Sequence, residues 1–334
     1  MTILNTNALI LLQAAKKLGI KTQILQSKPF KIKFTHNNKS HLIHSKSFNI
    51  NTSKKALKIS KNKNLTLKTL AKIGLPIPKH TTIHKPADYK NACQKISFPQ
   101  VIKPLTGEKG KHVYLNIKDQ SAGQTAVKQV LKNYPGGCLI ETYHQGNDYR
   151  FLCLNYKVIG ISKRLPPTIT GDSQSTIRQL IETENLRRFT LNQKAGRRFL
   201  NRMRNWPRLA FNLNLQGWTL KAVLPQGKTI QLYPLPNFST GGSVTTIDIS
   251  TIHHSLVNLA ETAAKTIGLE ICGIDILVKQ TRLRTLKCSK VRNLNKIIII
   301  EINSDPGLRL HDWPNQSTPQ NVSQKILKSI FSIP

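Results

Sequence analysis

Two short apolar segments near the C-terminus each lead to an acidic residue, and they constrain the fold more than any other feature. The segment 297–300 consists of four isoleucines and runs into Glu301 and Asn303, with Pro306 and Gly307 just beyond. A short apolar run that ends in a turn signal predicts a buried strand. Because side chains two residues apart on a strand face the same side, Glu301 and Asn303 should point together.

Asp275 occupies a similar place on a second predicted strand, residues 271–278. Carboxylate and amide oxygens on neighbouring strand ends are the hard ligands that Mg²⁺ prefers, so these three residues predict a metal site. The chain has 15 Asp and Glu against 51 Lys and Arg, and a carboxylate on an apolar strand is costly unless it is paired or bound to metal. The alternative is that each carboxylate forms a salt bridge with a nearby basic side chain.

The charge of the chain is unusual and unevenly distributed. The formal net charge is +36, no Asp or Glu precedes Asp88, and a second basic stretch runs from Arg187 to Arg208. Such a charge favours polyanionic partners: nucleic acid, an anionic membrane, acidic polymers or nucleotides. A hydrophobic fraction of 39% argues against disorder, and 334 residues allow one large domain or two to three small ones.

Several classes of protein are not favoured. The five cysteines show no CxxC spacing and predict free thiols in a reducing, cytoplasmic compartment. The histidines include no HExxH motif, and no apolar run approaches the length of a membrane span. Residues 8–15 are apolar but too short for a signal-peptide core, and we expect them to belong to a first helix.

Local patterns predict alternating helices and strands. Helices are expected at 7–18, 54–73, 121–132, 175–186, 252–267 and 320–331. Strands are expected at 21–25, 98–103, 138–164 (with a hairpin at Asn155), 217–235 and in the two acidic segments, with a weak hairpin signal over 30–50. The basic stretch 187–208 has no clean period.

A lysine and two glycines follow one another in VIKPLTGEKG. Lys103 would end a strand, and Gly107 and Gly110 would lie in the next loop, where backbone N–H groups can approach phosphate closely. The segment is neither a Walker A loop nor a Rossmann fingerprint. Taken alone, it is more typical of an ordinary turn than of a phosphate-binding loop.

The ordered set of motifs resembles the ATP-grasp ligases. It comprises Lys63, Lys103 with its glycine loop, IETYHQGNDYR, NFSTGGS, GID and EINSDPG, and the stretch GDSQSTIRQLIETEN. The likeness is closest to the ATP-grasp core of cyanophycin synthetase and to the glutathione-synthetase half of the bifunctional glutathione enzymes, from about Lys58 to Trp313. It implies an α+β ATP-grasp fold, in which two α/β subdomains clasp ATP.

The resemblance also implies a domain organisation. A small basic α/β domain over 1–60 would precede the ATP-grasp domain over 61–334. Within the latter, residues 85–160 would form the nucleotide-clamping subdomain. Residues 161–334 would form the metal and substrate subdomain, with a basic insertion near 187–210.

Family roles can be carried to matching residues. ATP would be held by Lys63, Lys103, Gly107, Gly110, Glu141, Thr142, Tyr143 and Asp148, with the hinge 141–143 receiving adenine and Asp148 the ribose. Two Mg²⁺ ions, for which Mn²⁺ could substitute, would be bound by Asp275, Glu301 and Asn303. The catalytic arginines would be Arg150, Arg164 and Arg309. The second substrate would meet Asn237, Ser239, Gly241, Gly242 and His311.

The implied activity is an ATP- and Mg²⁺-dependent carboxylate–amine ligase that releases ADP and phosphate. Its substrates would be small-molecule or peptide carboxylates and amines, acidic peptides among them, and a homo-oligomer is compatible with the sequence. The chain departs from the family in having His112 where a third loop glycine is usual, and it lacks the other domains of both relatives. Two alternatives remain open: a basic protein that binds nucleic acid or the ribosome, and an ATP-grasp domain without catalysis.

Overall fold

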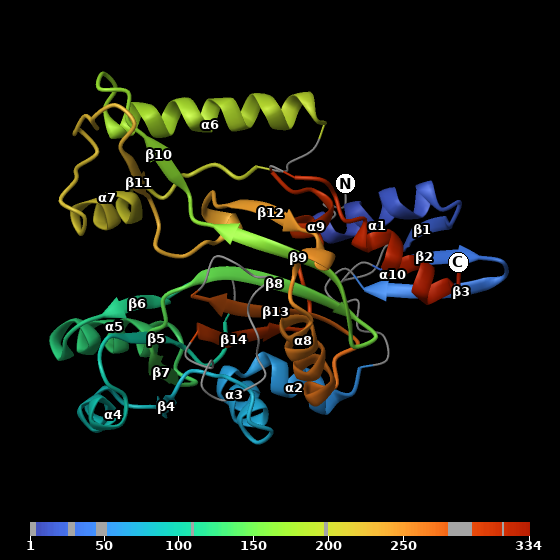
Figure 1. The fold of residues 1–334 in the computed structure, drawn as a ribbon, viewed down its shortest axis with the longest axis horizontal. Helices are drawn as coiled ribbons and strands as arrows, with labels where there is room; N and C mark the ends of the chain where they lie inside the picture. Colours follow the sequence, from blue (N-terminus) through green and yellow to red (C-terminus); the bar gives the residue numbers. More distant parts are fainter. Residues whose placement is uncertain are drawn as a thin grey trace. The chain divides into compact units, whose positions relative to one another are not determined.

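The two acidic strands lie side by side in the computed structural model, which describes residues 5–25, 31–44, 52–107, 110–196, 200–279, 296–315 and 317–334 (Figure 1). Strands β13 (Ile271–Val278) and β14 (Ile297–Asn303) pair antiparallel. They belong to a five-stranded sheet of order β12-β9-β8-β13-β14, with β8 at Asn147–Leu154, β9 at Lys157–Leu165 and β12 at Ser243–Ile247. Both predicted acidic strands are therefore confirmed.

The chain divides into two units. The first comprises Met1–Ser162, Thr246–Trp313 and Pro319–Pro334, and the second comprises Lys163–Thr245 and Pro314–Thr318. The chain leaves the first unit along β9 and returns to it along β12. Among the described residues, no helix combines the length and apolarity needed to span a membrane.

The core of the first unit lies on one face of the five-stranded sheet. Helix α8 (His254–Ile267) buries Leu256, Ala260 and Ile267 against this face, at a spacing that places them along one side of the helix. Gly268 ends α8 in the left-handed conformation, with φ of 80°. Helices α2 (Lys54–Lys61) and α3 (Lys63–Ala71) contact α8 as well.

Two smaller sheets complete the first unit. The sheet β4-β7-β5-β6 consists of His80–Ile83, Cys138–Thr142, Gln100–Pro104 and Tyr114–Ile117, and it packs against α4 (Tyr89–Lys95) and α5 (Gln120–Asn133). The sheet β1-β2-β3 consists of Lys21–Leu25, Lys31–His36 and Lys39–His44. Helix α1 (Thr6–Lys17) contacts β1, α9 (Arg309–Asp312) and α10 (Val322–Phe331) (Figure 1).

The second unit has its own core. Helix α6 (Ile177–Lys194) and helix α7 (Trp206–Asn214) accompany the strand pair β10 (Thr168–Thr170) and β11 (Thr229–Gln231). Ile177 and Ile181 of α6 and Leu209 and Leu213 of α7 join one buried cluster. The first turn of α6 is fixed by a capping box between Thr176 and Gln179.

Three predicted elements are wrong in their extent. The helix 54–73 is interrupted at Asn62, whose side chain accepts the N–H of Leu65 and so begins a new helix. The helix 175–186 continues to Lys194. The strands expected over 217–235 are reduced to β11, because a turn at Thr219–Ala222, Pro225 and a left-handed Gly227 interrupt the segment. The other predicted helices are confirmed within one or two residues, and the strand 21–25 is confirmed as β1. The weak hairpin signal over 30–50 corresponds to the hairpin of β2 and β3, with residues 45–50 outside the described part of the chain, and the hairpin at Asn155 is confirmed between β8 and β9.

Candidate functional site

A β-bulge turns Glu301 away from the core. Asp275 lies opposite Glu301, but Ile276 lies opposite Ile299, so Ile300 has no partner on β13. Ile297 and Ile299 face the core, and strict alternation would send Glu301 there too. The extra residue shifts the alternation, which places Glu301 and Asn303 together on the opposite face with Asp275. The prediction that Glu301 and Asn303 point to one side is confirmed.

A buried ion pair occupies the centre of this face. Arg150 of β8 lies opposite Asp275, and its Nη2 donates to Oδ2 at 2.8 Å while its Nε donates to Oδ1. Both side chains are buried. Gly273 makes room for the guanidinium, since a Cβ there would lie 2.7 Å from Arg150 Cδ and 2.9 Å from Nη1. Such a bidentate contact is strong and directional.

Lys63 links three parts of the first unit. Its Nζ lies 3.0 Å from a carboxylate oxygen of Glu301 and donates to the carbonyl oxygen of Gly107 at 2.9 Å. Its backbone N–H donates to Leu105 O at 3.0 Å. The residue at the start of α3 therefore joins the acidic face of the sheet to the glycine loop. Each carboxylate on this face, Asp275 and Glu301, is thus paired with a cation.

The acidic face is suited to a hard cation. Asp275 and Glu301 are cross-strand neighbours, Asn303 is next on the same face, and all three offer oxygen. Among the described residues, the buried Nδ2 atom of Asn303 has no hydrogen-bond partner. No group of three or more His, Cys, Asp or Glu that could hold a metal is found in the described ranges.

A second buried ion pair lies on the smaller sheet. Val101 is opposite Glu141, and Lys103 is on the same face two residues along β5. Lys103 Nζ donates to Glu141 Oε1 at 2.7 Å, and both side chains are buried. Glu141 Oε2 is buried and has no hydrogen-bond partner among the described residues. The pair leaves one acceptor available for a ligand.

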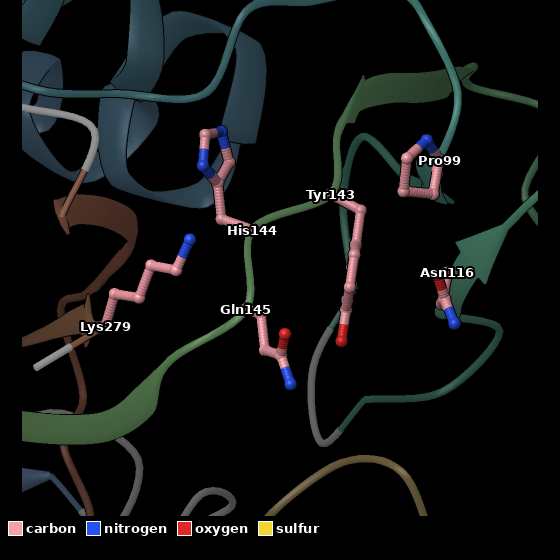
Figure 2. A pocket seen from close by; sticks show the side chains of 6 residues that line it. All are labelled: Pro99, Asn116, Tyr143, His144, Gln145 and Lys279. Carbon is pink, nitrogen blue, oxygen red and sulfur yellow. The ribbon is translucent and has the colours of Figure 1, made fainter.

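The segment after Glu141 borders a pocket of about 410 Å³ (Figure 2). The backbone N–H groups of Thr142 and Tyr143 are engaged by the carbonyls of Lys79 and Pro99, both at 2.9 Å. The pocket is lined by Pro99, Asn116, Tyr143, His144, Gln145 and Lys279. Lys279 extends from the end of β13 toward His144 in Figure 2.

Only Tyr143 of this lining was predicted from the sequence. Burial lowers the pKa of His144, against the opposing effect of Glu141, and its Nε2 lies 2.9 Å from Thr142 Oγ1. The position of Lys279 directly after the strand that carries Asp275 was the one signal that could have identified it.

The glycine loop keeps a left-handed residue where the family has a third glycine. His112 has φ of 51°, and Gly110 has φ of 65°. The His112 ring packs edge-on against Tyr134, with ring centroids 5.5 Å apart. Residues 108–109 of the loop lie outside the described residues. A histidine therefore adopts the backbone conformation that glycine adopts readily, at a cost of about 1–2 kcal/mol.

His311 and Asp148 are both buried beside other predicted residues. Asp148 lies opposite Leu277, two residues from Arg150 on β8. His311 is in α9 with Arg309; its Nδ1 lies 2.9 Å from Gln320 Oε1, and no described residue contacts its Nε2 with a hydrogen bond. Burial lowers the pKa of His311 to about 4; the Gln320 contact opposes this and the charges of Arg150 and Lys325 add to it.

The remaining predicted residues lie in the second unit. Arg164 is half-buried on β9. Asn237 organises the NFSTGG loop: its Oδ1 accepts from Ser239 N at 2.9 Å, and its carbonyl accepts from Thr240 and Gly242. Gly241 and Gly242 are buried, whereas Ser239 is exposed. The two glycines therefore belong to the interior of the loop, and Ser239 to its surface.

Comparisons with known proteins identify a matching domain and relatives of this chain. Residues 60–181 match the RimK-like ATP-grasp domain. Cyanophycin synthetase from Synechocystis sp. is 32% identical over 262 residues, which cover 77% of this chain and 29% of that protein. The bifunctional glutathione biosynthesis protein from Streptococcus mutans is 30% identical over 323 residues, which cover 94% of this chain and 41% of that protein. The chain thus spans well under half the length of these curated relatives.

Solved structures show the same fold. A bifunctional glutathione synthetase from Pasteurella multocida superposes with a TM-score of 0.67 at 22% identity, over 98% of this chain and 44% of that chain. The D-alanine–D-alanine ligase from Bacillus anthracis has a TM-score of 0.51 at 13% identity, over 86% of this chain and 70% of that chain. The resemblance and the fold expected from the sequence are confirmed: the chain has an ATP-grasp fold and carries a RimK-like ATP-grasp domain at residues 60–181.

Proposed function

We propose that this chain is an ATP-dependent carboxylate–amine ligase that releases ADP and phosphate. The observation that carries the proposal is the single sheet face that brings Arg150, Asp275, Glu301 and Asn303 together, with Lys63 reaching it from α3. A face with two carboxylates, an amide and two cations suits a phosphate group with its divalent metal. The relatives that share this fold include cyanophycin synthetase and a bifunctional glutathione biosynthesis protein.

The reaction has two steps. The γ-phosphoryl group of ATP is transferred to a carboxylate oxygen of the first substrate, and ADP leaves. The amine of the second substrate then forms a C–N bond as the C–O bond to phosphate breaks, so that inorganic phosphate leaves with the electron pair and the amine proton passes to solvent. Phosphoryl transfer requires mainly positioning and neutralisation of charge from the protein.

The residues have separate tasks in this proposal. Asp275, Glu301 and Asn303 would hold Mg²⁺, which neutralises phosphate charge when bound; two ions are the family expectation. Lys63 would leave Glu301 for a phosphate oxygen, and Arg150 would stay anchored on Asp275 with its remaining N–H available. Lys103 would neutralise phosphate, while the unpaired Oε2 of Glu141 would accept from the adenine amino group. Asp148, Arg164, Arg309 and the loop 237–242 keep the roles implied by the family resemblance.

The test is a screen of acid–amine pairs for phosphate release, with ADP measured in parallel. Equal amounts of ADP, phosphate and amide are expected. Production of AMP and pyrophosphate would refute the proposal.

Glu301→Gln provides the second test. It should lower turnover on the order of 100-fold, because an anionic metal ligand is lost while the shape is kept. Glu182→Gln is the matched control, since Glu182 is an exposed α6 residue paired only loosely with Arg178 at 3.9 Å. Normal turnover by the Glu301→Gln protein would show that the metal site is misassigned.

The nucleic-acid alternative is weakened by contacts within the second unit. Arg178 lies 4.7 Å above Trp206, Arg202 lies 4.7 Å above Phe189, and Arg208 lies 5.6 Å from the Tyr233 ring. Each of these aromatic rings therefore has one face covered by an arginine of the same chain. Stacking of nucleic-acid bases, which the alternative requires, would be restricted to the uncovered faces of these rings.

A further inference from the structure

Helix α6 presents three polar side chains along one face of the second unit. Asn185, Arg188 and Asn192 are separated by three and four residues, so they project from the same side of the helix. Arg188 is buried and the two asparagines are half-buried, whereas the neighbouring Arg187 and Phe189 are exposed. This face belongs to the stretch that the sequence indicated only as a basic region without a period.

The two asparagines hold an extended segment, residues 200–203, against the helix. Asn185 Nδ2 donates to Met203 O and its Oδ1 accepts from Met203 N, both at 2.8 Å. Asn192 does the same with Leu200, at 2.8 and 2.9 Å. Each side-chain amide thus pairs with both polar groups of one backbone residue, as a neighbouring strand would.

The same layer then reaches the NFSTGG loop. Arg188 Nη1 donates to the carbonyls of Asn201 and Gly241, both at 2.7 Å. The side chain of Asn201, itself buried, donates to Phe238 O at 2.9 Å. Two backbone carbonyl oxygens of the loop, those of Phe238 and Gly241, therefore accept hydrogen bonds from buried side chains.

Glu184 balances the buried guanidinium. Its Oε1 accepts from Arg188 Nε at 2.7 Å, and it also accepts two hydrogen bonds from Arg187. Burial raises the pKa of Glu184, but the hydrogen bonds from Arg187 and Arg188 outweigh burial and lower it. The Glu184 carboxylate therefore remains charged beside Arg188.

The contact with the loop is tight enough to require glycine. Gly241 has φ of 100°, and a Cβ there would lie 2.5 Å from Met203 Cγ and 3.2 Å from Arg188 Nη1. Above this contact, the N–H groups of Thr240, Gly241 and Gly242 bond to carbonyls of Asn237 and Phe238. The loop is therefore held by its own backbone hydrogen bonds and by those from Arg188 and Asn201, while Ser239 is exposed.

We propose that α6 and residues 200–203 form a rigid support that positions the second-substrate loop, and that Arg188 is its positioning residue. The basic stretch would then act inside the enzyme, as the base of the loop, in addition to contributing charge to the surface. The part of the proposal that concerns substrate rests on the proposed ligase function. The part that concerns the loop stands on the contacts alone.

The first experiment is hydrogen exchange on Arg188→Met and on Arg187→Met. Both changes remove one positive charge and one partner of Glu184, but Arg187 donates both of its hydrogen bonds to Glu184 within the described part of the chain, and its side chain is 58% exposed. Arg188→Met should accelerate exchange at the amides of Thr240, Gly241 and Gly242 at least tenfold. Exchange at Leu232, whose N–H donates to Pro167 O at 2.8 Å, should stay unchanged, as should all of these amides in Arg187→Met. Unaltered exchange in the loop of Arg188→Met overturns the proposal.

The second experiment uses the acid–amine pair found by phosphate release. Arg188→Met should raise the KM for the amine at least tenfold and leave the KM for ATP within twofold, a split that general destabilisation would not produce. Faster exchange without a change in either substrate KM would mean that the loop is supported but does not place substrate. Failure of every pair to release phosphate would count against the ligase function, while the exchange result would still decide whether the support exists.

Arg188→Lys guards against a failure of Arg188→Met to fold. Lysine keeps the charge beside Glu184 but lacks the planar fork that meets the carbonyls and the carboxylate together. Exchange in the loop should therefore rise by a smaller factor than in Arg188→Met, with the same split between the two KM values. Loop exchange and KM values equal to those of the parent protein would overturn the role of Arg188.

Discussion

At the scale of single residues, His311 shows how burial changes a titration. The imidazole is fully buried, burial lowers its pKa from 6.5 to about 4, and its Nε2 has no hydrogen-bond partner in the described part of the chain. The unfolded chain takes up a proton at this residue below pH 6.5, whereas the folded protein resists until about pH 4. The stability that His311 contributes is therefore complete above pH 6.5 and is lost as the pH falls toward 4.

The loss of stability at low pH gives a measurable prediction. At pH 5 the loss from His311 should be about 2 kcal/mol, since each pH unit between the two pKa values contributes about 1.4 kcal/mol. His311→Asn removes the titration, so the difference in urea midpoint between pH 7 and pH 5 should shrink relative to the parent protein. Asp312, whose pKa is raised chiefly by burial, is present in both proteins and cancels in the comparison. An identical pH dependence in both proteins would contradict the prediction.

Gly273 gives a second prediction at this scale. A methyl group at this position would meet the Arg150 side chain at 2.7 Å and force it off the buried Asp275. We expect Gly273→Ala to destabilise the protein by about 3 kcal/mol, the lower end of what breaking a buried ion pair costs. Gly136→Ala is the control, because nothing lies within 4 Å of its Cβ position. Equal urea midpoints for the two variants would show that Arg150 has room to move.

At the scale of elements, the first helix is fastened to the loop that follows the acidic strand. Asn7 of α1 donates to Pro306 O at 3.1 Å and accepts from Leu308 N at 3.0 Å. This loop connects Asn303 to Arg309 and His311. Asn7→Ala should lower the free energy of unfolding by about 1–3 kcal/mol, because it leaves two half-buried backbone groups without a partner. It should also lower turnover.

The comparison for this prediction is Asn133→Ala. Asn133 makes one exposed hydrogen bond, to Gln129 O at 2.8 Å, and its loss should have little effect on unfolding or turnover. If Asn7→Ala unfolds at the same urea concentration as Asn133→Ala, the clamp on residues 306–308 carries no stability.

Sequence patterns predicted elements with regular periods and failed where tertiary contacts decide the structure. The apolar runs around Asp275 and Glu301 identified both strands, and Gly268 identified the end of α8. The second half of α6 has no clean apolar period; its polar face is fixed by contacts with residues 200–203 and Gly241 that no local pattern reports. Residues 217–235 contain strand-forming residues, but Pro225 and the turns around it leave only the three-residue strand β11 and an isolated β-bridge at Val223.

The sequence motifs predict which residues belong to the candidate site, but not which cation pairs with which carboxylate. Motif order identified Lys63, Arg150, Asp275 and Glu301. Which cation faces which carboxylate depends on strand register, and register depends on the bulge at Ile300, which the run of four isoleucines conceals. Gly273, His144 and Lys279 were missed for the same reason, because their importance arises from what lies beside them in space.

At the scale of the whole molecule, charge is the property that the fold does not explain. The formal net charge is +36, and residues 1–87 contain no acidic residue. Poly-acidic peptides should therefore be better second substrates than neutral amino acids, through faster association. With such a peptide, kcat/KM should fall steeply between low and high salt while kcat changes little, since the Debye length is about 10 Å at 0.1 M. A neutral amino acid substrate is the control, and equal salt responses would assign the charge to the solvated surface alone.

The bulge at Ile300 has a consequence for how this site tolerates change. Side chains of a strand alternate between the two faces of the sheet, so one extra residue moves every later side chain of the strand to the opposite face. The face on which Glu301 lies thus depends on the number of residues in the run of four isoleucines more than on their identity. Exchanging Ile300 for another aliphatic residue preserves the count, whereas losing it would carry the carboxylate of Glu301 into the hydrocarbon interior. We therefore expect this strand to tolerate substitution of Ile300 by another aliphatic residue far better than an insertion or deletion of one residue.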